Sequence, residues 1–326
     1  MSLLKVKNLK TYFYIDDEVI PAVDGVSFEI KKGEILALVG ESGSGKSVTS
    51  LSIMGLIREP GRVIDGEILF NNENLLQKKE KQMQHIRGNQ IAMVYQEPMS
   101  SLNPNIRIGD QIAEVLIIHK KVSSKSDAKK QSIEIMKLVG ISDADKRYKD
   151  YPSQFSGGMR QRIVIAMAII CNPQLLIADE PTTALDVTVQ AEILSLLQDL
   201  IKNKDMSILL ITHDLGVVAE IADRVCIMYC GKIMEETSKA NLFKNPLNPY
   251  TKGLIKCIPR TDDKADILYT IGGSVPYPTE FPKGCRFSTR CPEVMEKCKD
   301  ELPLLVDVGD DHLVCCFLYN QSEVEL

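Results

Sequence analysis

The sequence has no excess of positive charge. Of its 326 residues, 39 are Lys or Arg and 44 are Asp or Glu, so the net charge is -5. Proteins that bind nucleic acid through one broad face carry clustered basic residues. The charge balance therefore argues against that class, although it leaves room for a local basic patch.

Long apolar runs are also absent. A membrane-spanning helix needs about 20 apolar residues in succession, whereas the longest run, residues 163–171, has nine. The first ten residues, MSLLKVKNLK, contain neither the apolar segment nor the cleavage site of a signal peptide. We therefore expect a soluble, cytosolic chain. The hydrophobic fraction of 44% is enough for an ample core and roughly two domains.

A phosphate-binding motif organises the rest of the chain. Residues 40–47, GESGSGKS, match G-x-x-x-x-G-K-[ST] and lie between a predicted strand at 34–39 and a predicted helix at 47–57. In this context glycines let backbone N–H groups surround a phosphate at a helix N-terminus. We expect Lys46 to reach the β- and γ-phosphates and the Ser47 hydroxyl to bind Mg²⁺. The alternative is a Gly/Ser-rich turn.

Polar residues end three further predicted strands. Gln96 follows one, Asp179 and Glu180 end the second, and His213 follows the third. Open α/β sheets bind ligands at the carboxyl ends of their strands. We expect Asp179 to hold Mg²⁺ through water, Glu180 to act as general base, Gln96 to contact Mg²⁺ or the attacking water, and His213 to contact the γ-phosphate. Each residue taken alone also has a structural interpretation.

The middle of the chain is predicted to be helical. Residues 97–152 contain two amphipathic helices, at 108–120 and 128–139, which indicates a helical insertion. A further helix begins at Ser156-Gly157-Gly158. Two glycines are unfavourable at a helix start but permit close approach to a phosphate. An ordinary helix capped by serine is the alternative.

The C-terminal residues 246–326 are rich in proline and cysteine. Five of the nine cysteines lie there: Cys285, Cys291, Cys298, Cys315 and Cys316. Their spacing matches no common zinc finger, whereas wide, unequal gaps suit an iron–sulfur cluster. Zinc and unligated thiols are the alternatives. The scattered Cys171 and Cys226 lie in apolar runs and are expected to be buried.

These motifs, in this order, resemble the ATP-binding cassette family over about residues 3–245. The motifs that carry the resemblance are GESGSGKS, Gln96, SGGMRQR at 156–162, LLIADEP at 175–181, TALD at 183–186 and His213. The resemblance implies an α/β P-loop NTPase cassette at 1–245, with N-terminal antiparallel strands and a helical subdomain at about 97–170. A small, irregular, cysteine-rich domain at 246–326 follows it.

The resemblance also assigns roles to residues. It implies catalytic roles for Glu180, His213 and Gln96, and Mg²⁺ contacts for Ser47, Gln96 and Asp179. The residues implied to contact ATP are Phe13, Gly40, Ser42, Gly43, Ser44, Gly45, Lys46, Ser47, Val48, Gln96, Asp179, Ser156, Gly157, Gly158 and Asp186. The last four belong to loops that, in the family, meet ATP across a head-to-tail dimer. Phe13 fits the adenine-stacking position best, with Tyr12 and Tyr14 as alternatives.

Three segments narrow the resemblance further. Dipeptide and oligopeptide importer ATPases, a group that includes nickel importers, have segments similar to residues 22–28, 96–104 and 249–254. These importers commonly pair two different ATPases, and residues 155–168 resemble the first of the pair, the D-type. The implied partners are a second cassette ATPase in a heterodimer, two membrane permease subunits and an extracellular or periplasmic substrate-binding protein, with no nucleic acid. The implied location is peripheral, on the cytoplasmic face of the membrane. Asn248 stands where this group usually has His.

The resemblance extends to the cysteines. In these importers the segment ends in His-x-Val-Ala-Cys, which places Cys316 as a fourth ligand and Cys315 at the Ala position. This implies a [4Fe–4S] cluster on Cys285, Cys291, Cys298 and Cys316, with zinc as the alternative. Two other functions stay open: a soluble cassette ATPase that acts on nucleic acid or ribosomes, and a regulatory nucleotide sensor.

Overall fold

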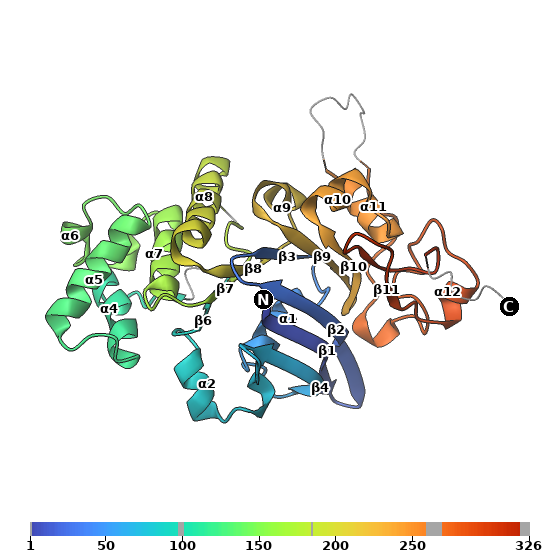
Figure 1. The fold of residues 1–326 in the computed structure, drawn as a ribbon, viewed down its shortest axis with the longest axis horizontal. Helices are drawn as coiled ribbons and strands as arrows, with labels where there is room; N and C mark the ends of the chain where they lie inside the picture. The colour runs from blue at the N-terminus through green and yellow to red at the C-terminus, as the bar shows by residue number, and fades with distance from the viewer. Residues whose placement is uncertain (1, 97–100, 184, 259–268, 320–326) are drawn as a thin grey trace. The chain divides into compact units, whose positions relative to one another are not determined.

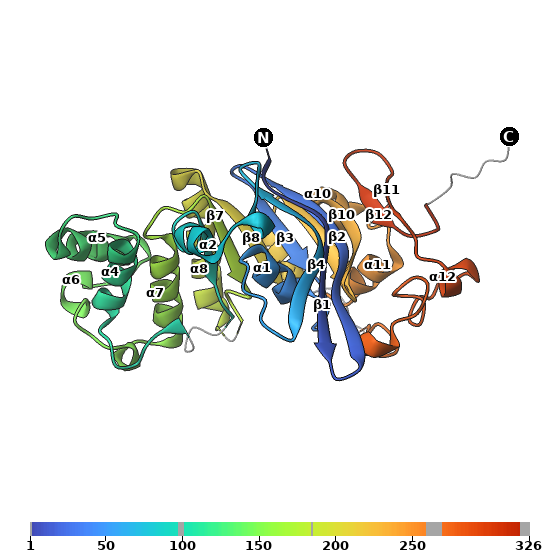
Figure 2. The same ribbon diagram turned by 90° about the horizontal axis from the view of Figure 1, so that it is seen from below.

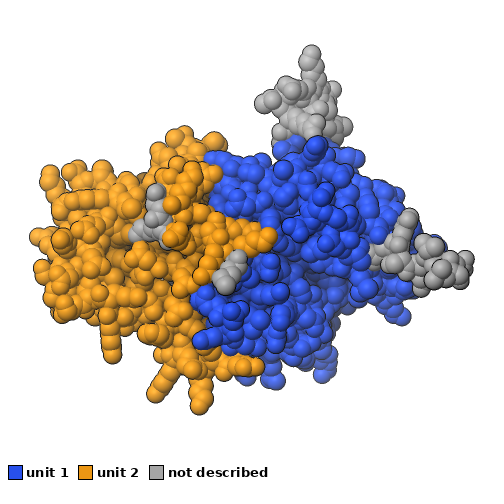
Figure 3. Space-filling view, in the orientation of Figure 1, with its two compact units in different colours: residues 1–30, 35–76, 211–326 blue, residues 31–34, 77–210 orange. Residues whose placement is uncertain are grey.

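The chain folds into two compact units. The structure, a computed structural model, describes residues 2–96, 101–183, 185–258 and 269–319. Unit 1 comprises residues 1–30, 35–76 and 211–326, and unit 2 comprises residues 31–34 and 77–210 (Figure 3). The chain thus leaves unit 1 and returns to it. The sequence predicts a domain boundary at 245/246. The division into these two units does not test that boundary, which stays a prediction.

Unit 1 contains an antiparallel sheet with the strand order β2-β1-β4-β5 (Figure 2). Its strands are β1 Ser2–Ile15, β2 Glu18–Lys31, β4 Gly61–Phe70 and β5 Glu73–Asn74. Buried Leu4 and Val6 alternate with more exposed residues along β1, as expected for a half-buried strand. The alternation that predicts the strand is therefore confirmed.

A second group of strands forms the core of unit 1, in the order β11-β12-β10-β9-β3. Their bounds are β3 Ile35–Val39, β9 Arg224–Tyr229, β10 Lys232–Ser238, β11 Leu305–Asp307 and β12 Leu313–Cys315. Strands β3 and β9 are parallel, and every residue of β3 is buried. A continuous apolar run is typical of a strand covered on both faces.

The cysteine-rich end of the chain extends this group of strands. Strand β12 pairs antiparallel with β10, with Glu235 opposite Val314, and β11 pairs with β12. The sequence does not predict these two strands, because three residues are too few to show alternation. The helices of unit 1 are α1 Lys46–Ile53, η1 Leu75–Gln77, α9 Leu215–Ile221, α10 Lys239–Lys244, α11 Pro249–Lys256, η3 Pro278–Glu280 and α12 Lys297–Asp300.

Unit 2 combines buried strands with most of the longer helices (Figure 1). Its strands follow the order β8-β7-β6, with β6 Ile91–Val94, β7 Leu175–Asp179 and β8 Ser207–Thr212. Its helices are α2 Glu80–Ile86, α4 Ile108–Ile118, α5 Lys125–Leu138, α6 Ala144–Arg147, η2 Pro152–Gln154, α7 Gly157–Ile169 and α8 Val187–Lys204. The predicted helical insertion is therefore present as helices α4, α5 and α6. Across the described residues, no helix is long and apolar enough to cross a membrane.

Candidate functional site

The glycine-rich loop connects β3 to α1, as the motif predicts. Helix α1 begins at Lys46, whose Nζ donates hydrogen bonds to the backbone oxygens of Gly40 (2.7 Å) and Glu41 (3.0 Å). Its ammonium also lies 3.4 Å from Ser44 Oγ. Ser47, in the first turn of α1, is exposed. The loop therefore presents a helix N-terminus and an accessible hydroxyl, which suits an anion with a bound cation.

Two loop glycines are required by their surroundings. A Cβ at Gly40 would lie 2.1 Å from the backbone oxygen of Met228. Gly45 has φ +102°, and a Cβ there would lie 2.3 Å from the backbone oxygen of Ala22. Any larger residue would push the loop away from β9 and β2. Ser42 and Gly43 are exposed and Val48 is half-buried, so these predicted contact residues border the loop's open side.

The three aromatic residues of β1 have different surroundings. The Tyr12 hydroxyl donates to Asp24 Oδ1 (2.9 Å), and Tyr14 is exposed, with the Arg62 guanidinium 5.9 Å from its ring centre. Phe13 is half-buried and packs against Gly61, where an added Cβ would lie 2.6 Å from the ring. Phe13 remains the predicted adenine-stacking residue.

In unit 2 two predicted catalytic residues are in direct contact. Gln96 Nε2 donates to Glu180 Oε2 (2.9 Å), and Thr183 Oγ1 donates to the same oxygen (2.9 Å). Asp179 ends β7 and is 6% exposed. Glu180 has φ +47°, a left-handed conformation that is uncommon for glutamate. The turn therefore directs the carboxylate toward Gln96. Thr183 is a contact that the sequence analysis did not assign.

The other predicted residues start helices. Ser156 caps α7 by accepting from the Met159 N–H (3.4 Å), and Asp186 caps α8 by accepting from the Val189 N–H (3.0 Å). Ser156 and Gly157 are exposed, whereas Gly158 packs so closely on α8 that a Cβ would lie 2.4 Å from Val189 Cγ1. In unit 1, His213 is exposed directly after β8.

Two residues that the sequence analysis missed contact the glycine-rich loop from the C-terminal part of unit 1. The Tyr250 hydroxyl accepts from the Glu41 N–H (3.1 Å), and the Arg290 guanidinium pairs with the Glu41 carboxylate (2.7 Å). Positions so far apart in sequence give no periodic or motif signal that could reveal these contacts.

The five C-terminal cysteines line one small cavity of about 20 Å³. They are free thiols, and burial raises the pKa of Cys285 and of Cys291 to about 11. Cys315 differs from the others because its thiol donates to the Pro303 backbone oxygen (3.2 Å), and burial raises its pKa to about 12. Within the described parts of the chain, no group of three or more His, Cys, Asp or Glu side chains is placed to hold a metal ion. The thiols thus suit a metal by chemical type but not by their present spacing.

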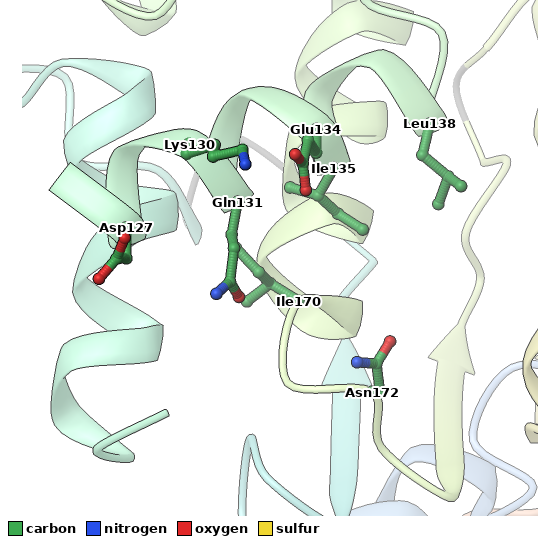
Figure 4. Close-up of a pocket in the computed structure, with 8 residues that line it drawn as sticks. All are labelled: Asp127, Lys130, Gln131, Glu134, Ile135, Leu138, Ile170 and Asn172. Carbon is green, nitrogen blue, oxygen red and sulfur yellow. The ribbon is translucent and has the colours of Figure 1, made fainter. Parts of the chain in front are cut away.

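A larger cavity, of about 460 Å³, lies along α5 (Figure 4). Its lining residues are Asp127, Lys130, Gln131, Glu134, Ile135, Leu138, Ile170 and Asn172. None of these is a predicted site residue, and acidic, basic and apolar groups alternate along it. We assign it no part in nucleotide binding.

The chain is similar to known protein families and to individual relatives. The sequence profile of the family described as "ABC transporter" matches residues 23–183, and that described as "Oligopeptide/dipeptide transporter, C-terminal region" matches residues 234–298. The oligopeptide transport ATP-binding protein AppD of Bacillus subtilis is 54% identical over 325 residues, covering 99% of both chains. This chain belongs to the ABC transporter family.

Two other comparisons agree with this assignment. The dipeptide transport ATP-binding protein DppD of Bacillus subtilis is 50% identical and covers 98% of this chain and 95% of its own. A solved dimeric, post-hydrolysis ATP-binding cassette, MJ0796, bound to ADP and phosphate, superposes with a TM-score of 0.65 at 28% identity. It covers 72% of this chain and 98% of its own. The chain therefore has the cassette ATPase fold, as the sequence predicts, and ATP is its expected nucleotide.

Proposed function

We propose that this chain is the ATP-hydrolysing subunit of an importer for dipeptides or oligopeptides. The identity of 54% with a relative named for oligopeptide transport, along nearly the whole of both chains, carries this proposal. The match of residues 234–298 to the C-terminal region of such transporters supports it. Separate permease chains would provide the passage through the membrane, with this chain attached at the cytoplasmic face.

We propose the same site roles for this chain that its motifs predict. The loop at 40–47, Asp179 and Mg²⁺ would hold ATP, with Phe13 against the adenine. Glu180 would polarise the attacking water, and the Gln96–Glu180 hydrogen bond of 2.9 Å supports a shared role for these two side chains. His213 would contact the γ-phosphate. Hydrolysis at such sites depends on positioning and charge stabilisation rather than on covalent chemistry.

We propose that the second half of each ATP site comes from a partner cassette. Ser156 and Gly157 are exposed at the start of α7, and Val187, next to Asp186, is 84% exposed. These exposed residues are accessible to a partner cassette. A heterodimer with a second cassette ATPase, two permease subunits and a substrate-binding protein would complete the importer.

The helical part of unit 2 is the proposed contact with the permease. Ile117 and Ile118 at the end of α4 are 48% and 65% exposed, so two apolar side chains here are accessible to a partner. The adjoining loop at 97–104 belongs to the same prediction, but Glu97–Ser100 lie outside the described residues.

Reconstitution tests the importer proposal. The complete importer in proteoliposomes, supplied with Mg-ATP, is expected to accumulate labelled dipeptides or longer peptides, and Lys46→Ala should abolish uptake. Uptake of nickel without peptide would favour the nickel importer. ATP turnover that RNA stimulates and the permease does not would favour a soluble ATPase acting on nucleic acid.

We also propose that Cys285, Cys291, Cys298 and Cys316 bind a [4Fe–4S] cluster. Their shared cavity supports this, and so does the hydrogen bond that engages the Cys315 thiol elsewhere. The cavity is no larger than the space of about one water molecule, so these side chains must move outward around a cluster. The simplest role of the cluster is to stabilise a segment that has little apolar core.

Metal analysis of protein purified without oxygen tests the cluster. About four irons and four sulfides per chain are expected, by the stoichiometry of such clusters. Cys316→Ser should remove both, and Cys315→Ser, the matched control, should retain both. Stoichiometric zinc without iron would replace the cluster by a zinc site, whereas protein without any metal would leave only free thiols.

A further inference from the structure

Arg290 forms a two-pronged ion pair with the glycine-rich loop. Its Nη1 lies 2.7 Å from Glu41 Oε2, and its Nη2 lies 3.1 Å from Glu41 Oε1. Glu41 is the second residue of GESGSGKS, whereas Arg290 immediately precedes Cys291 in the C-terminal segment. Parallel hydrogen bonds of this kind combine charge with a fixed orientation.

The surroundings of Arg290 hold its guanidinium in place. The side chain is 4% exposed, and its Nε donates to the Gly272 backbone oxygen (3.1 Å). Nη1 also donates to the Tyr229 hydroxyl (3.3 Å), and the guanidinium carbon lies 5.7 Å from the centre of that ring. A guanidinium that is buried and bonded in this way is pre-organised and loses little freedom when it pairs.

A second contact holds the backbone of the same loop residue. The Tyr250 hydroxyl accepts from the Glu41 N–H at 3.1 Å. The Tyr250 ring packs against Tyr229 and Phe287, with ring centres 4.6 and 5.2 Å away. The start of the loop is therefore fixed at side chain and backbone by one cluster of buried aromatic residues and Arg290.

Glu41 has a charge of the wrong sign for a phosphate site. The Glu41 backbone oxygen accepts from Lys46 Nζ at 3.0 Å, so this residue belongs to the part of the loop that Lys46 contacts. A carboxylate near a bound triphosphate repels it, and the repulsion is strong where water is scarce. A buried arginine paired with that carboxylate offsets its charge and holds the side chain in one orientation.

We propose that Arg290 is a positioning residue for ATP. It neutralises Glu41 and fixes the first turn of the phosphate-binding loop, so the affinity for the phosphates depends on the C-terminal segment. This inference rests on the proposed role of residues 40–47 in ATP binding. Arg290 acts through Glu41 and the loop, without touching the nucleotide itself.

Arg286 provides a matched control. Its Nη2 lies 2.8 Å from Asp24 Oδ2, so it also joins the C-terminal segment to the N-terminal part of unit 1 by a half-buried ion pair. Asp24 lies on β2, outside the glycine-rich loop. Loss of Arg286 should therefore remove one ion pair between the same parts of the chain without changing the charge of the loop, while Asp24 stays paired with Lys232 (3.1 Å).

The test is nucleotide binding by the full-length chain, measured by calorimetry with Mg-ATP, Mg-ADP and adenosine. Arg290→Gln should weaken the binding of ATP on the order of tenfold, weaken that of ADP less, and leave that of adenosine unchanged. The reason is that the lost neutralisation of Glu41 acts on the phosphate charges. Arg286→Gln should leave all three dissociation constants unchanged. Arg290→Lys should be intermediate, since an ammonium keeps the charge but cannot make the two parallel bonds.

Two Glu41 variants separate charge from packing. Glu41→Gln should bind ATP at least as tightly as the original chain, and the double variant Glu41→Gln/Arg290→Gln should recover most of the affinity lost in Arg290→Gln. Equal weakening by Arg286→Gln and Arg290→Gln, or equal weakening for ATP and adenosine, would overturn the proposal. An original chain that binds ATP no better than Lys46→Ala would instead refute the ATP role of the loop, and this inference with it.

Discussion

The proposed role of Glu180 is to act on water rather than to bind the nucleotide. Its carboxylate accepts hydrogen bonds from Gln96 and Thr183, both at 2.9 Å, which leaves its orientation fixed. Glu180 and Thr183 follow buried strand β7, and Gln96 follows the parallel neighbouring strand β6. We therefore expect the charge of Glu180, rather than its size, to matter for turnover.

Glu180→Gln is therefore expected to retain ATP binding and to lose nearly all ATP hydrolysis. The amide keeps the shape but cannot act as a base, and general-base catalysis contributes roughly 10²–10⁴-fold. ATP affinity and phosphate release by the assembled importer measure the two effects. Thr183→Val, which removes one donor only, is the control and should retain most turnover. Unchanged turnover in Glu180→Gln would show that another group is the base.

Asn248 is the residue that departs from the pattern of similar importers, and it is fully engaged. Its side chain caps α11 by accepting from the Tyr250 N–H (2.9 Å), and its amide donates to the backbone oxygens of Cys315 (2.9 Å) and Met234 (3.3 Å). The residue is 1% exposed. It therefore links α11, β10 and the cysteine segment.

Asn248→Ala should lower the free energy of unfolding by about 2 kcal/mol, since a helix cap and buried hydrogen bonds are both lost. Asn248→Asp should cost at least as much, although Asp is an equally good cap, because it removes the amide donor. Chemical denaturation measures both. Ser124→Ala removes the exposed cap of α5 and a hydrogen bond to the Asp127 side chain, and should cost about 1 kcal/mol. An Asn248→Asp variant as stable as the original would show that capping is its whole role.

At the scale of elements, helices α7 and α8 pack closely because Gly158 has no side chain. A Cβ at Gly158 would lie 2.4 Å from Val189 Cγ1, whereas no atom of the described residues lies within 4 Å of one at Gly157. Adjacent glycines in the same helical turn therefore have separate roles. Gly158 permits packing, and Gly157 leaves the start of α7 open.

Gly158→Ala should destabilise the chain by about 1–3 kcal/mol, the usual cost of overpacking, and Val189→Ala should relieve most of it. Gly157→Ala should fold normally and still lose ATP turnover in the assembled importer, because a methyl group would stand where a partner's nucleotide approaches. Thermal unfolding and phosphate release distinguish the two. Normal turnover in Gly157→Ala would remove the support for a nucleotide at this surface.

The regular elements could be predicted because their signals are local. The buried runs of β3, β7 and β8 and the amphipathic α4 and α5 all lie within a few residues of the predicted bounds. The polar run at 76–87 also has helical character in the sequence, and the structure has a short η1 there followed by α2. Strand β12 depends on pairing with β10, and β11 depends on pairing with β12, which no local pattern encodes.

The same distinction applies to the site. The motif residues could be named from sequence because each phosphate contact needs a particular residue type at a fixed spacing. The Arg290–Glu41 pair spans 249 positions, and the Tyr250 contact spans 209. Such contacts become visible only once the sheet has brought the two segments together. The four proposed cluster ligands are likewise gathered by the fold around one cavity.

At the scale of the whole molecule, a single cassette has only half of each proposed ATP site. We expect the isolated chain to bind ATP but to hydrolyse it slowly, and turnover to rise when the second ATPase and the permease are added. Glu180→Gln with Mg-ATP should trap the paired cassettes as a stable dimer, which light scattering would detect. Fast hydrolysis by the isolated chain as a monomer would contradict the shared-site arrangement.

The ion pair between Glu41 and Arg290 also has a consequence for synthesis on the ribosome. Translation produces the phosphate-binding loop early and Arg290 some 249 residues later. A nascent chain therefore exposes the complete glycine motif long before Arg290, which neutralises Glu41 of that motif, has left the exit tunnel. Tight nucleotide binding would then begin only when the chain is nearly finished, so a prematurely terminated product would have the motif but not its full affinity, and would compete poorly for ATP and for partners.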